Sequence, residues 1–126
     1  MHIKNAAVIF AADHARLARF YVALTEMVQT HTDADHTVLE SAHFQLVLHA
    51  LRGEPDAAAA GMPAAREETY IKLCFPVRDL AVARTHAIAF GGRLKDPEAE
   101  WSTRGFRACD GVDPEGNVVQ WRMPAP

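Results

Sequence analysis

Two side chains in the segment Glu100–Phe106 have the chemistry needed to hold a planar acid. Trp101 and Arg104 lie there among polar residues, which is typical of a loop or a strand edge. An indole ring can stack on a planar ligand, and a guanidinium can bind a carboxylate through two parallel hydrogen bonds. Trp101 could equally be a lid on the core, and Arg104 could simply be solvated. Both are candidate ligand-binding residues.

The residue types that most often carry catalysis show no recognised spacing. Cys74 and Cys109 form no CxxC pair, and Cys74 lies in an apolar run where a thiolate is disfavoured. No serine or cysteine stands in a nucleophile motif beside a base, and Gly91-Gly92 follows a predicted helix, whereas a phosphate-binding loop precedes one. Six histidines lack the spacing that places two ligands on one helix face, and we expect them to be surface or structural residues: His2, His14, His31, His36, His43 and His86.

Composition limits the class of protein. The chain has 126 residues, about one domain, with 49% hydrophobic and 23% charged residues, as in ordinary globular proteins. Its 13 lysines and arginines are scattered and its net charge is −3, so we expect no nucleic-acid partner. No apolar stretch approaches the ~20 residues that span a bilayer, and none has the flanks of a signal peptide. We expect a cytoplasmic protein without a membrane partner.

The elements that would position Trp101 and Arg104 follow a pattern of secondary structure that occurs twice in the chain. The apolar run 6–10 predicts a strand, Asp13 caps a helix through residue 24, and the runs 37–39 and 44–48 predict further strands. The pattern restarts with a predicted strand over 71–75 and a helix that Asp79 caps and Gly91-Gly92 ends. The second copy of the pattern ends with predicted strands over 107–109 and 118–121, which a turn over 113–117 joins.

These segments give module one over residues 1–52 and module two over 67–126, in a single domain. Between them, residues 53–66 are rich in Ala, Pro and Gly and are predicted to form a linker. A repeated unit that cannot bury its own apolar face implies that the two modules pack together.

Three features in order resemble the hallmarks of the vicinal-oxygen-chelate superfamily, which includes glyoxalases, bleomycin resistance proteins and extradiol dioxygenases. They are Asp13 before Phe20-Tyr21, Asp79 before Gly91-Gly92, and the closing run Asp113-Pro114-Glu115-Gly116-Asn117-Val118-Val119-Gln120. The resemblance covers nearly the whole chain. It implies an α+β fold in which two βαβββ modules form an incomplete eight-stranded barrel around a cup-shaped cavity, commonly completed by dimerisation. We therefore expect a homodimer.

In metal-dependent members, the first and last strand of each module each supply one metal ligand. The resemblance places these four positions at Lys72, Gln120, His49, and either Asn5 or Ala6, according to whether a bulge follows in the first strand. Such a site needs imidazole and carboxylate ligands, and only one histidine is present. We expect no metal and no other cofactor, and we take Asn5, His49, Lys72 and Gln120 as candidate ligand-binding residues together with Trp101 and Arg104.

Lys72 is the informative position, because a lysine is almost never buried without a partner. It should have a counter-ion, for which Glu67 or Glu68 are candidates, or else a ligand with an anionic group. His49 and Gln120 could instead only satisfy hydrogen bonds in a polar core.

Three functions remain open. The first is a metal-free small-molecule-binding protein of the bleomycin-resistance type, which holds a planar or acidic ligand in the cup. The second is a lyase or dioxygenase-type enzyme that uses Lys72 as base or electrophile, or an atypical metal site through His49 and Gln120. The third is a module kept only for assembly.

Overall fold

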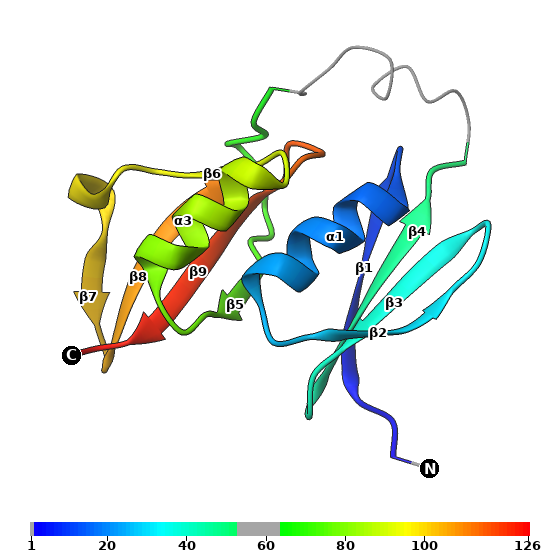
Figure 1. Ribbon diagram of the computed structural model, residues 1–126, viewed down its shortest axis with the longest axis horizontal. Coiled ribbons are helices and arrows are strands. Elements are labelled where there is room, and N and C mark those ends of the chain that lie inside the picture. The colour runs from blue at the N-terminus through cyan, green and yellow to red at the C-terminus, as the bar shows by residue number, and fades with distance from the viewer. Residues whose placement is uncertain (1, 53–63) are drawn as a thin grey trace.

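The computed structural model describes residues 2–52 and 64–126, and these form two modules that each pair one α-helix with one sheet (Figure 1). In module one the sheet order is β1-β4-β3-β2, with β1 and β4 parallel and the other pairs antiparallel. Its elements are β1 (Asn5–Ala11), α1 (His14–Leu24), β2 (Val28–Thr32), β3 (His36–Glu40) and β4 (Phe44–Ala50).

Module two repeats this plan. Its sheet has the order β5-β9-β8-β6, with β7 also paired to β8, and only β5 and β9 run parallel. Its elements are β5 (Cys74–Pro76), α3 (Leu80–Ala89), β6 (Arg93–Leu94), the 3-10 helix η1 (Pro97–Ala99), β7 (Trp101–Thr103), β8 (Phe106–Val112) and β9 (Val118–Pro124). The expected α+β fold of two repeated modules is confirmed, and in the described part of the chain the two sheets stay separate.

Both helices begin where the sequence predicts. The side chain of Asp13 accepts a hydrogen bond from the backbone N–H of Arg16, and Asp79 caps α3 in the same way through Val82. At the end of α3, Gly91 has a φ of +94°, which favours glycine. Gly92 serves a different purpose, because a Cβ there would stand 2.4 Å from the carbonyl oxygen of Val112 and 2.5 Å from the Phe20 ring.

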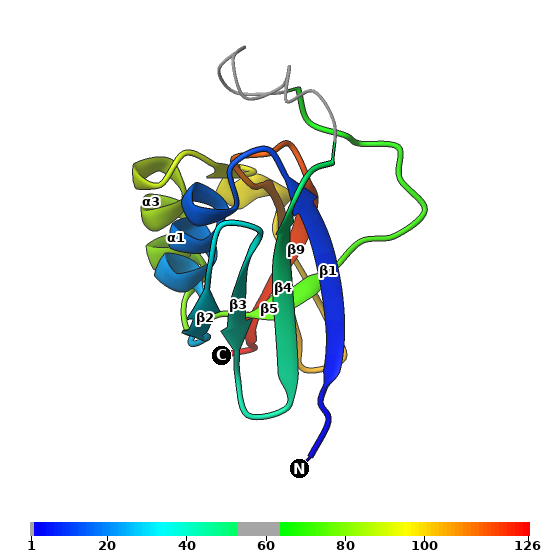
Figure 2. The same cartoon turned by 90° about the vertical axis from the view of Figure 1, so that its right-hand side faces the viewer.

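The main core lies where the two modules meet. Aromatic rings from both modules form edge-to-face and tilted contacts with centroids 5.2–5.9 Å apart, and they belong to Phe20, Tyr21, Phe75 and Trp121. All four residues are buried. The helices α1 and α3 contact each other and lie on the same side of the molecule, with the strands on the other side (Figure 2).

The turn between β8 and β9 fastens the modules together. Asp113 is buried, and its Oδ2 accepts hydrogen bonds from the hydroxyl of Tyr21 at 2.7 Å and from the amide of Asn117 at 2.8 Å. Its Oδ1 accepts from the backbone N–H groups of Glu115 and Asn117. The Glu115 carboxylate accepts in turn from the backbone N–H of Ala12 and of Asp13. The predicted turn is confirmed, and it also caps the start of α1.

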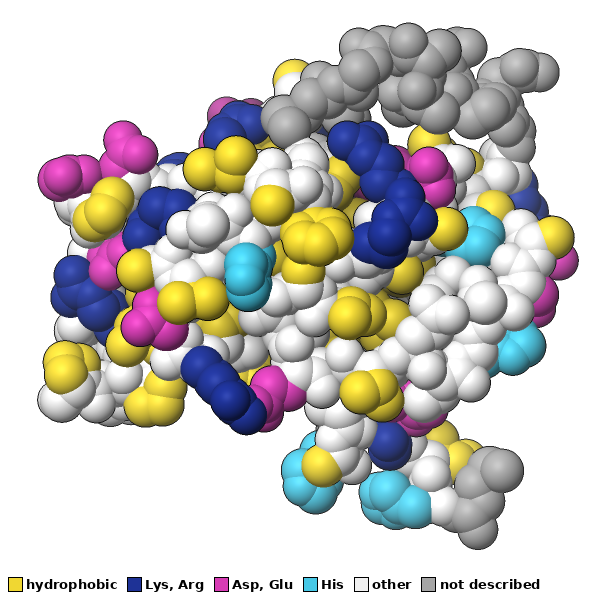
Figure 3. All heavy atoms as spheres, viewed as in Figure 1, with side chains coloured by type: hydrophobic (Ala, Val, Ile, Leu, Met, Phe, Trp, Pro, Cys, Tyr) yellow, Lys and Arg dark blue, Asp and Glu magenta, His cyan; other side chains and the backbone are white. Residues whose placement is uncertain are grey.

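Each sheet has one face toward the helices and one open face. Along β1, Ala11 is fully buried, whereas Val8 and Phe10 on the opposite face are 53% and 54% exposed. Along β9, Val119 and Trp121 are buried, while Gln120 and Arg122 alternate with them on the other side. We call the side away from the helices the open face of each sheet. On the helix side, positive and negative side chains are interspersed (Figure 3).

Some elements differ from the sequence-based expectation. The predicted strand over 71–75 is wrong at its start, because β5 begins at Cys74, which pairs with Gln120. Continuing that register would set Lys72 opposite Val118, the first residue of β9, and would leave Ile71 without a partner. The residue patterns did not indicate short β6 or polar β2, since neither shows apolar alternation, although the family resemblance implies three strands after each helix.

The predicted linker lies mostly outside the described residues, because residues 53–63 are not described. At its end, Arg66 forms an isolated parallel bridge with Asn117. No helix in the described part of the chain is long and apolar enough to cross a membrane.

Candidate functional site

The open face of module two gathers charged and aromatic side chains from four segments. Cross-strand pairing sets Asp110 beside Gln120, and Ala108 between Arg122 and Trp101. Residues paired in this way point to the same face of a sheet. Lys72, just before β5, reaches the same face, so we call Lys72, Asp110, Gln120 and Arg122 the charged cluster.

Lys72 has a counter-ion, but it is neither of the expected glutamates. Its Nζ donates a hydrogen bond to Oδ2 of Asp110 at 2.7 Å, and the two side chains are 43% and 15% exposed. The expectation that Glu67 or Glu68 pairs with Lys72 is therefore wrong. The carboxylate that does so is remote in sequence and adjacent only through the sheet. The other oxygen of Asp110, Oδ1, is buried and receives no hydrogen bond from the described residues.

Gln120 is held by Arg122. The Nε of Arg122 donates to Oε1 of Gln120 at 2.6 Å, and the thiol of Cys74 lies 3.7 Å from the same oxygen. The Nη2 of Arg122 is 3.4 Å from the Cys74 sulfur. Gln120 thus orients the Arg122 guanidinium across the open face. With Lys72 and Arg122 positive and only Asp110 negative, the charged cluster has one excess positive charge.

An aromatic platform adjoins the charged cluster. The Cζ of Arg122 lies 4.4 Å from the centre of the Phe106 ring, and that of Arg104 lies 5.2 Å from it. Arg104 has a φ of 44° and forms with Gly105 the tight turn between β7 and β8. Trp101 is 38% exposed and stands on β7 at the same face. Trp101, Arg104, Lys72 and Gln120 are therefore brought to one face.

The candidate residues of module one lie on the other sheet. The ring of His49 on β4 is 5.6 Å from that of Phe10 and stacks on that of His36 at 6.0 Å. His49 Nδ1 is 2.8 Å from the carbonyl oxygen of Ala50. Phe10 pairs with His49, so strand alternation places Ala6 on the face of His49 and Asn5 on the helix side. Asn5 is thus not brought together with His49.

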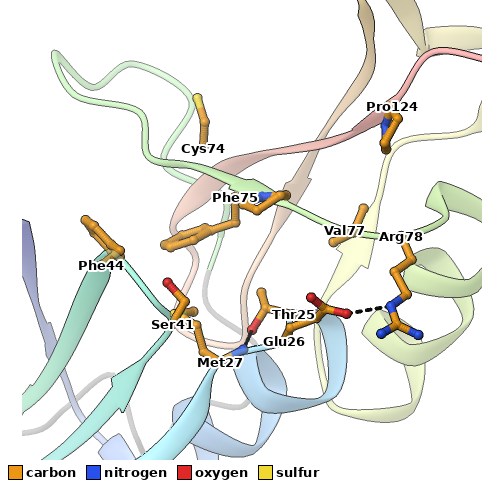
Figure 4. A pocket seen from close by; sticks show the side chains of 11 residues that line it. Thr25, Glu26, Met27, Ser41, Phe44, Cys74, Phe75, Val77, Arg78 and Pro124 are labelled. Carbon is orange, nitrogen blue, oxygen red and sulfur yellow. Dashed lines mark hydrogen bonds and ion pairs between the residues drawn. The ribbon is translucent and has the colours of Figure 1, made fainter.

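A well-formed cavity among the described residues lies elsewhere. It has a volume of about 610 Å³ and lies between the end of α1, the β3–β4 turn and β5 (Figure 4). Its wall is mainly apolar, from residues such as Met27, Phe44, Phe75 and Val77. None of the six candidate ligand-binding residues lines it. Cys74 does, and the same thiol contacts Gln120, so the cavity lies next to the charged cluster.

Two members of the charged cluster were not predicted. Arg122 could have been found, because a strand alternates with period two and Gln120 and Arg122 must share a face once Gln120 is placed there. Asp110 gave no such signal. Its position beside Lys72 depends on the pairing of β8 with β9 and of β5 with β9, which the sequence pattern does not define.

Comparison with known proteins identifies the class. The chain matches the model of the glyoxalase-like domain over residues 6–120, and it belongs to that family within the vicinal-oxygen-chelate superfamily. A search of curated proteins finds no match.

Solved structures with this fold are distant in sequence. A glyoxalase/bleomycin resistance protein/dioxygenase family enzyme from Burkholderia phytofirmans is 18% identical, with a TM-score of 0.68 over 96% of this chain and 98% of that one. The fosfomycin resistance protein FosX from Mesorhizobium loti is 11% identical, with a TM-score of 0.65 over 98% and 92%. The bleomycin resistance determinant of transposon Tn5 is 20% identical, with a TM-score of 0.61 over 99% and 100%. These likenesses show the fold.

The residues at the four positions where the family resemblance predicts metal ligands do not fit a divalent cation. The ammonium of Lys72 and the guanidinium of Arg122 already pair with the oxygens of Asp110 and Gln120. An added cation would meet two positive charges, and a lysine ammonium offers no lone pair. In module one, Ala6 has no donor atom, which leaves His49 alone.

We expect the purified protein to carry no stoichiometric divalent ion at these positions, because only His49 is a good ligand among them. Elemental analysis after dialysis measures this directly. About one equivalent of Zn, Ni, Mn or Fe that disappears in a His49→Ala variant would contradict the expectation.

Proposed function

We propose that this chain is a metal-free small-molecule-binding protein that holds a planar, acidic ligand against the open face of module two. The observation that carries the proposal is the position of Arg122. Its guanidinium lies over Phe106, bonds to Gln120 and stands in one cluster with Lys72. An aromatic platform bordered by cations suits a ligand with a flat ring and an anionic group, since stacking and charged hydrogen bonds then act together.

The excess positive charge of the cluster favours a ligand with a negative charge. The ammonium of Lys72 forms an ion pair with Asp110. This single carboxylate neutralises only one of the two cations, Lys72 and Arg122. A ligand carboxylate or phenolate can bridge Lys72 and Arg122, while its ring reaches toward Trp101 and Phe106. Arg104, which also faces Phe106, widens the platform at its outer edge.

An enzymatic function through Lys72 is the alternative. A base or nucleophile needs a free amine, and Nζ of Lys72 is engaged with Asp110 at 2.7 Å. The amine would have to leave this partner before it could react. The geometry therefore favours binding over catalysis by Lys72, and binding is the function that we propose.

The test is a calorimetric titration with small aromatic carboxylates, namely benzoate, salicylate and 2-naphthoate, each compared with its primary amide. The amide keeps the ring and the shape but removes the charge. We expect at least one carboxylate to bind and its amide to bind about tenfold more weakly or not at all, as for a lost charged hydrogen bond. Equal binding of acids and amides, or no binding by any of them, would count against the proposal.

The ligand would be enclosed by a second copy of the chain. Both β1 and β5 are sheet edges, and unpaired edges are commonly covered. Beside the β1 edge lies an apolar groove of about 470 Å³, lined by residues that include Val8, Phe10 and Ile71. Ile71 is 77% exposed. A homodimer that covers these side chains would close the open faces into a cup.

We expect light scattering at micromolar concentration to give twice the 13.9 kDa mass of one chain. A Phe10→Lys variant, which places a charge in the exposed apolar groove, should shift the equilibrium toward monomer, whereas Ile88→Lys on the exposed side of α3 should not. A monomeric wild-type protein would contradict the dimer and leave the fold unchanged.

A further inference from the structure

A second group of chemically competent side chains lies at the hairpin between β2 and β3, on the open face of module one. Nε2 of His31 lies 2.9 Å from Oδ2 of Asp33, and Nδ1 of His36 lies 3.1 Å from Oδ1 of Asp33. The three ligand atoms are all within 4.8 Å of one another. We call these three residues the hairpin triad. It contains none of the four metal positions that the family resemblance gives.

A β-bulge puts the first histidine on this face. Gln29 pairs with Leu39, but His31 pairs with Val38, so one extra residue is inserted in β2 between them. Without the bulge, Thr30 would oppose Val38 and His31 would turn toward the helix side. With the bulge, His31 shares the open face with His36, and their rings are 4.8 Å apart.

The carboxylate of Asp33 is fixed by the turn. Its Oδ1 accepts hydrogen bonds from the backbone N–H groups of Asp35 at 2.8 Å and of His36 at 3.0 Å. These bonds leave Oδ2 directed to His31. On the far side, His36 stacks on His49 with an angle of 12° between the ring planes. The scaffold thus restrains both the carboxylate and one imidazole before any ion arrives.

We propose that His31, Asp33 and His36 bind a divalent transition-metal ion of the Zn²⁺, Ni²⁺ or Cu²⁺ class. Two imidazoles and one carboxylate are the donors that such ions prefer. Zn–N and Zn–O distances are about 2.0–2.2 Å, so an ion between the imidazoles and the carboxylate needs only small rotations of exposed side chains. The side chains of His31, Asp33 and His36 are 52%, 43% and 32% exposed, which leaves room for water as a further ligand.

Because the site is open and has three protein ligands, we expect affinity in the micromolar range and loss of the ion on dialysis. The site is therefore compatible with a protein that is metal-free as purified. It is also independent of ligand binding at module two, since the triad shares no residue with the charged cluster.

The experiment is calorimetric titration of the untagged, chelator-treated protein with ZnCl₂, paired with the visible absorption spectrum after addition of CoCl₂. We expect one equivalent to bind, with imidazole-ligand absorption for Co²⁺. His31→Ala and His36→Ala should each weaken Zn²⁺ binding at least ~10-fold. Asp33→Asn should weaken it as well, although its amide oxygen can still accept the two backbone hydrogen bonds, so the hairpin is preserved.

Three controls separate this site from others. His43→Ala removes an exposed histidine of the β3–β4 turn, at the other end of β3, and should leave Zn²⁺ affinity unchanged, as should Lys72→Met. His49→Ala removes the histidine at a family metal position and also the ring on which His36 stacks, so it should weaken Zn²⁺ binding less than His31→Ala or His36→Ala does. Absence of Zn²⁺ binding, binding unaffected by His31→Ala and His36→Ala, or binding abolished by His49→Ala alone would each overturn the proposal.

Discussion

Replacing Asp113 by alanine is expected to lower the free energy of unfolding by about 3–5 kcal/mol, as leaving several partly buried donors unpaired costs about 1–3 kcal/mol each. The carboxylate accepts four hydrogen bonds, from the Tyr21 hydroxyl, the Asn117 amide and two backbone N–H groups. It is fully buried between the modules. Chemical denaturation monitored by tryptophan fluorescence measures the effect, since Trp121 lies in the same core.

Two further variants make the test specific. Tyr21→Phe removes one of the four donors and should cost about 1.5–3 kcal/mol, the range for one hydrogen bond to a charged group. Asp96→Ala removes an exposed aspartate that makes no capping bond, and should change stability by less than about 0.5 kcal/mol. If Asp113→Ala were as stable as Asp96→Ala, the proposed fastening of the modules by this turn would be wrong.

The same carboxylate predicts a pH dependence. Burial raises the pKa of Asp113 above its ordinary value, only partly offset by the hydrogen bonds from Tyr21 and Asn117. The folded protein therefore binds a proton more tightly than the unfolded chain at this site. The contribution of Asp113 protonation to stability is complete below the ordinary pKa and is lost as pH rises through the folded pKa. Relative to Asp113→Asn, the wild type should thus gain stability as pH falls across that interval.

Replacing Lys72 by methionine is expected to weaken the binding of an aromatic carboxylate by ~1.5–3 kcal/mol, the range for a charged hydrogen bond, which is about 10- to 150-fold in affinity. Methionine keeps most of the stem volume and deletes the charge. The amide of the same acid should lose little affinity. Calorimetric titration of both compounds against both proteins measures the difference.

The Asp110 carboxylate allows a stricter test. In Asp110→Asn, Lys72 loses its partner at 2.7 Å, so its ammonium is available to the ligand and the acid should bind more tightly. Lys95→Met makes the same lysine substitution at an exposed site outside the cluster and should leave affinity unchanged. If Lys72→Met bound the acid as well as the wild type did, the charged cluster would not be the ligand site.

The effect of Lys72→Met on stability differs from what an unpaired lysine would give. If the ammonium had no partner in the free protein, its removal would cost little stability. The structure pairs it with Asp110, whose side chain is only 15% exposed, so the substitution leaves a carboxylate without its counter-ion. Because Lys72 itself is 43% exposed, solvent screens the pair and the cost should stay within about 1 kcal/mol.

The elements with local signals could be predicted from the sequence alone. Asp13 and Asp79 mark both helix starts because a short carboxylate reaches the free N–H groups of its own first turn. The turn at 113–117 and the long strands were readable from turn residues and apolar runs, and the order of these signals indicated two repeated modules. Gly91 was readable as a helix end because positive φ is a local requirement.

The side chains that meet on the open faces could be identified only in the three-dimensional structure. Lys72 and Asp110 are far apart in the chain, and their contact depends on the register of β5 and β8 against β9. His31 joins His36 because a single bulge in β2 reverses the face on which it lies. A shift of one residue turns every following side chain to the other side of a sheet. Registers and bulges are set by the packing of whole strands against the helices, so no local pattern could predict the contact of Lys72 with Asp110 or the hairpin triad.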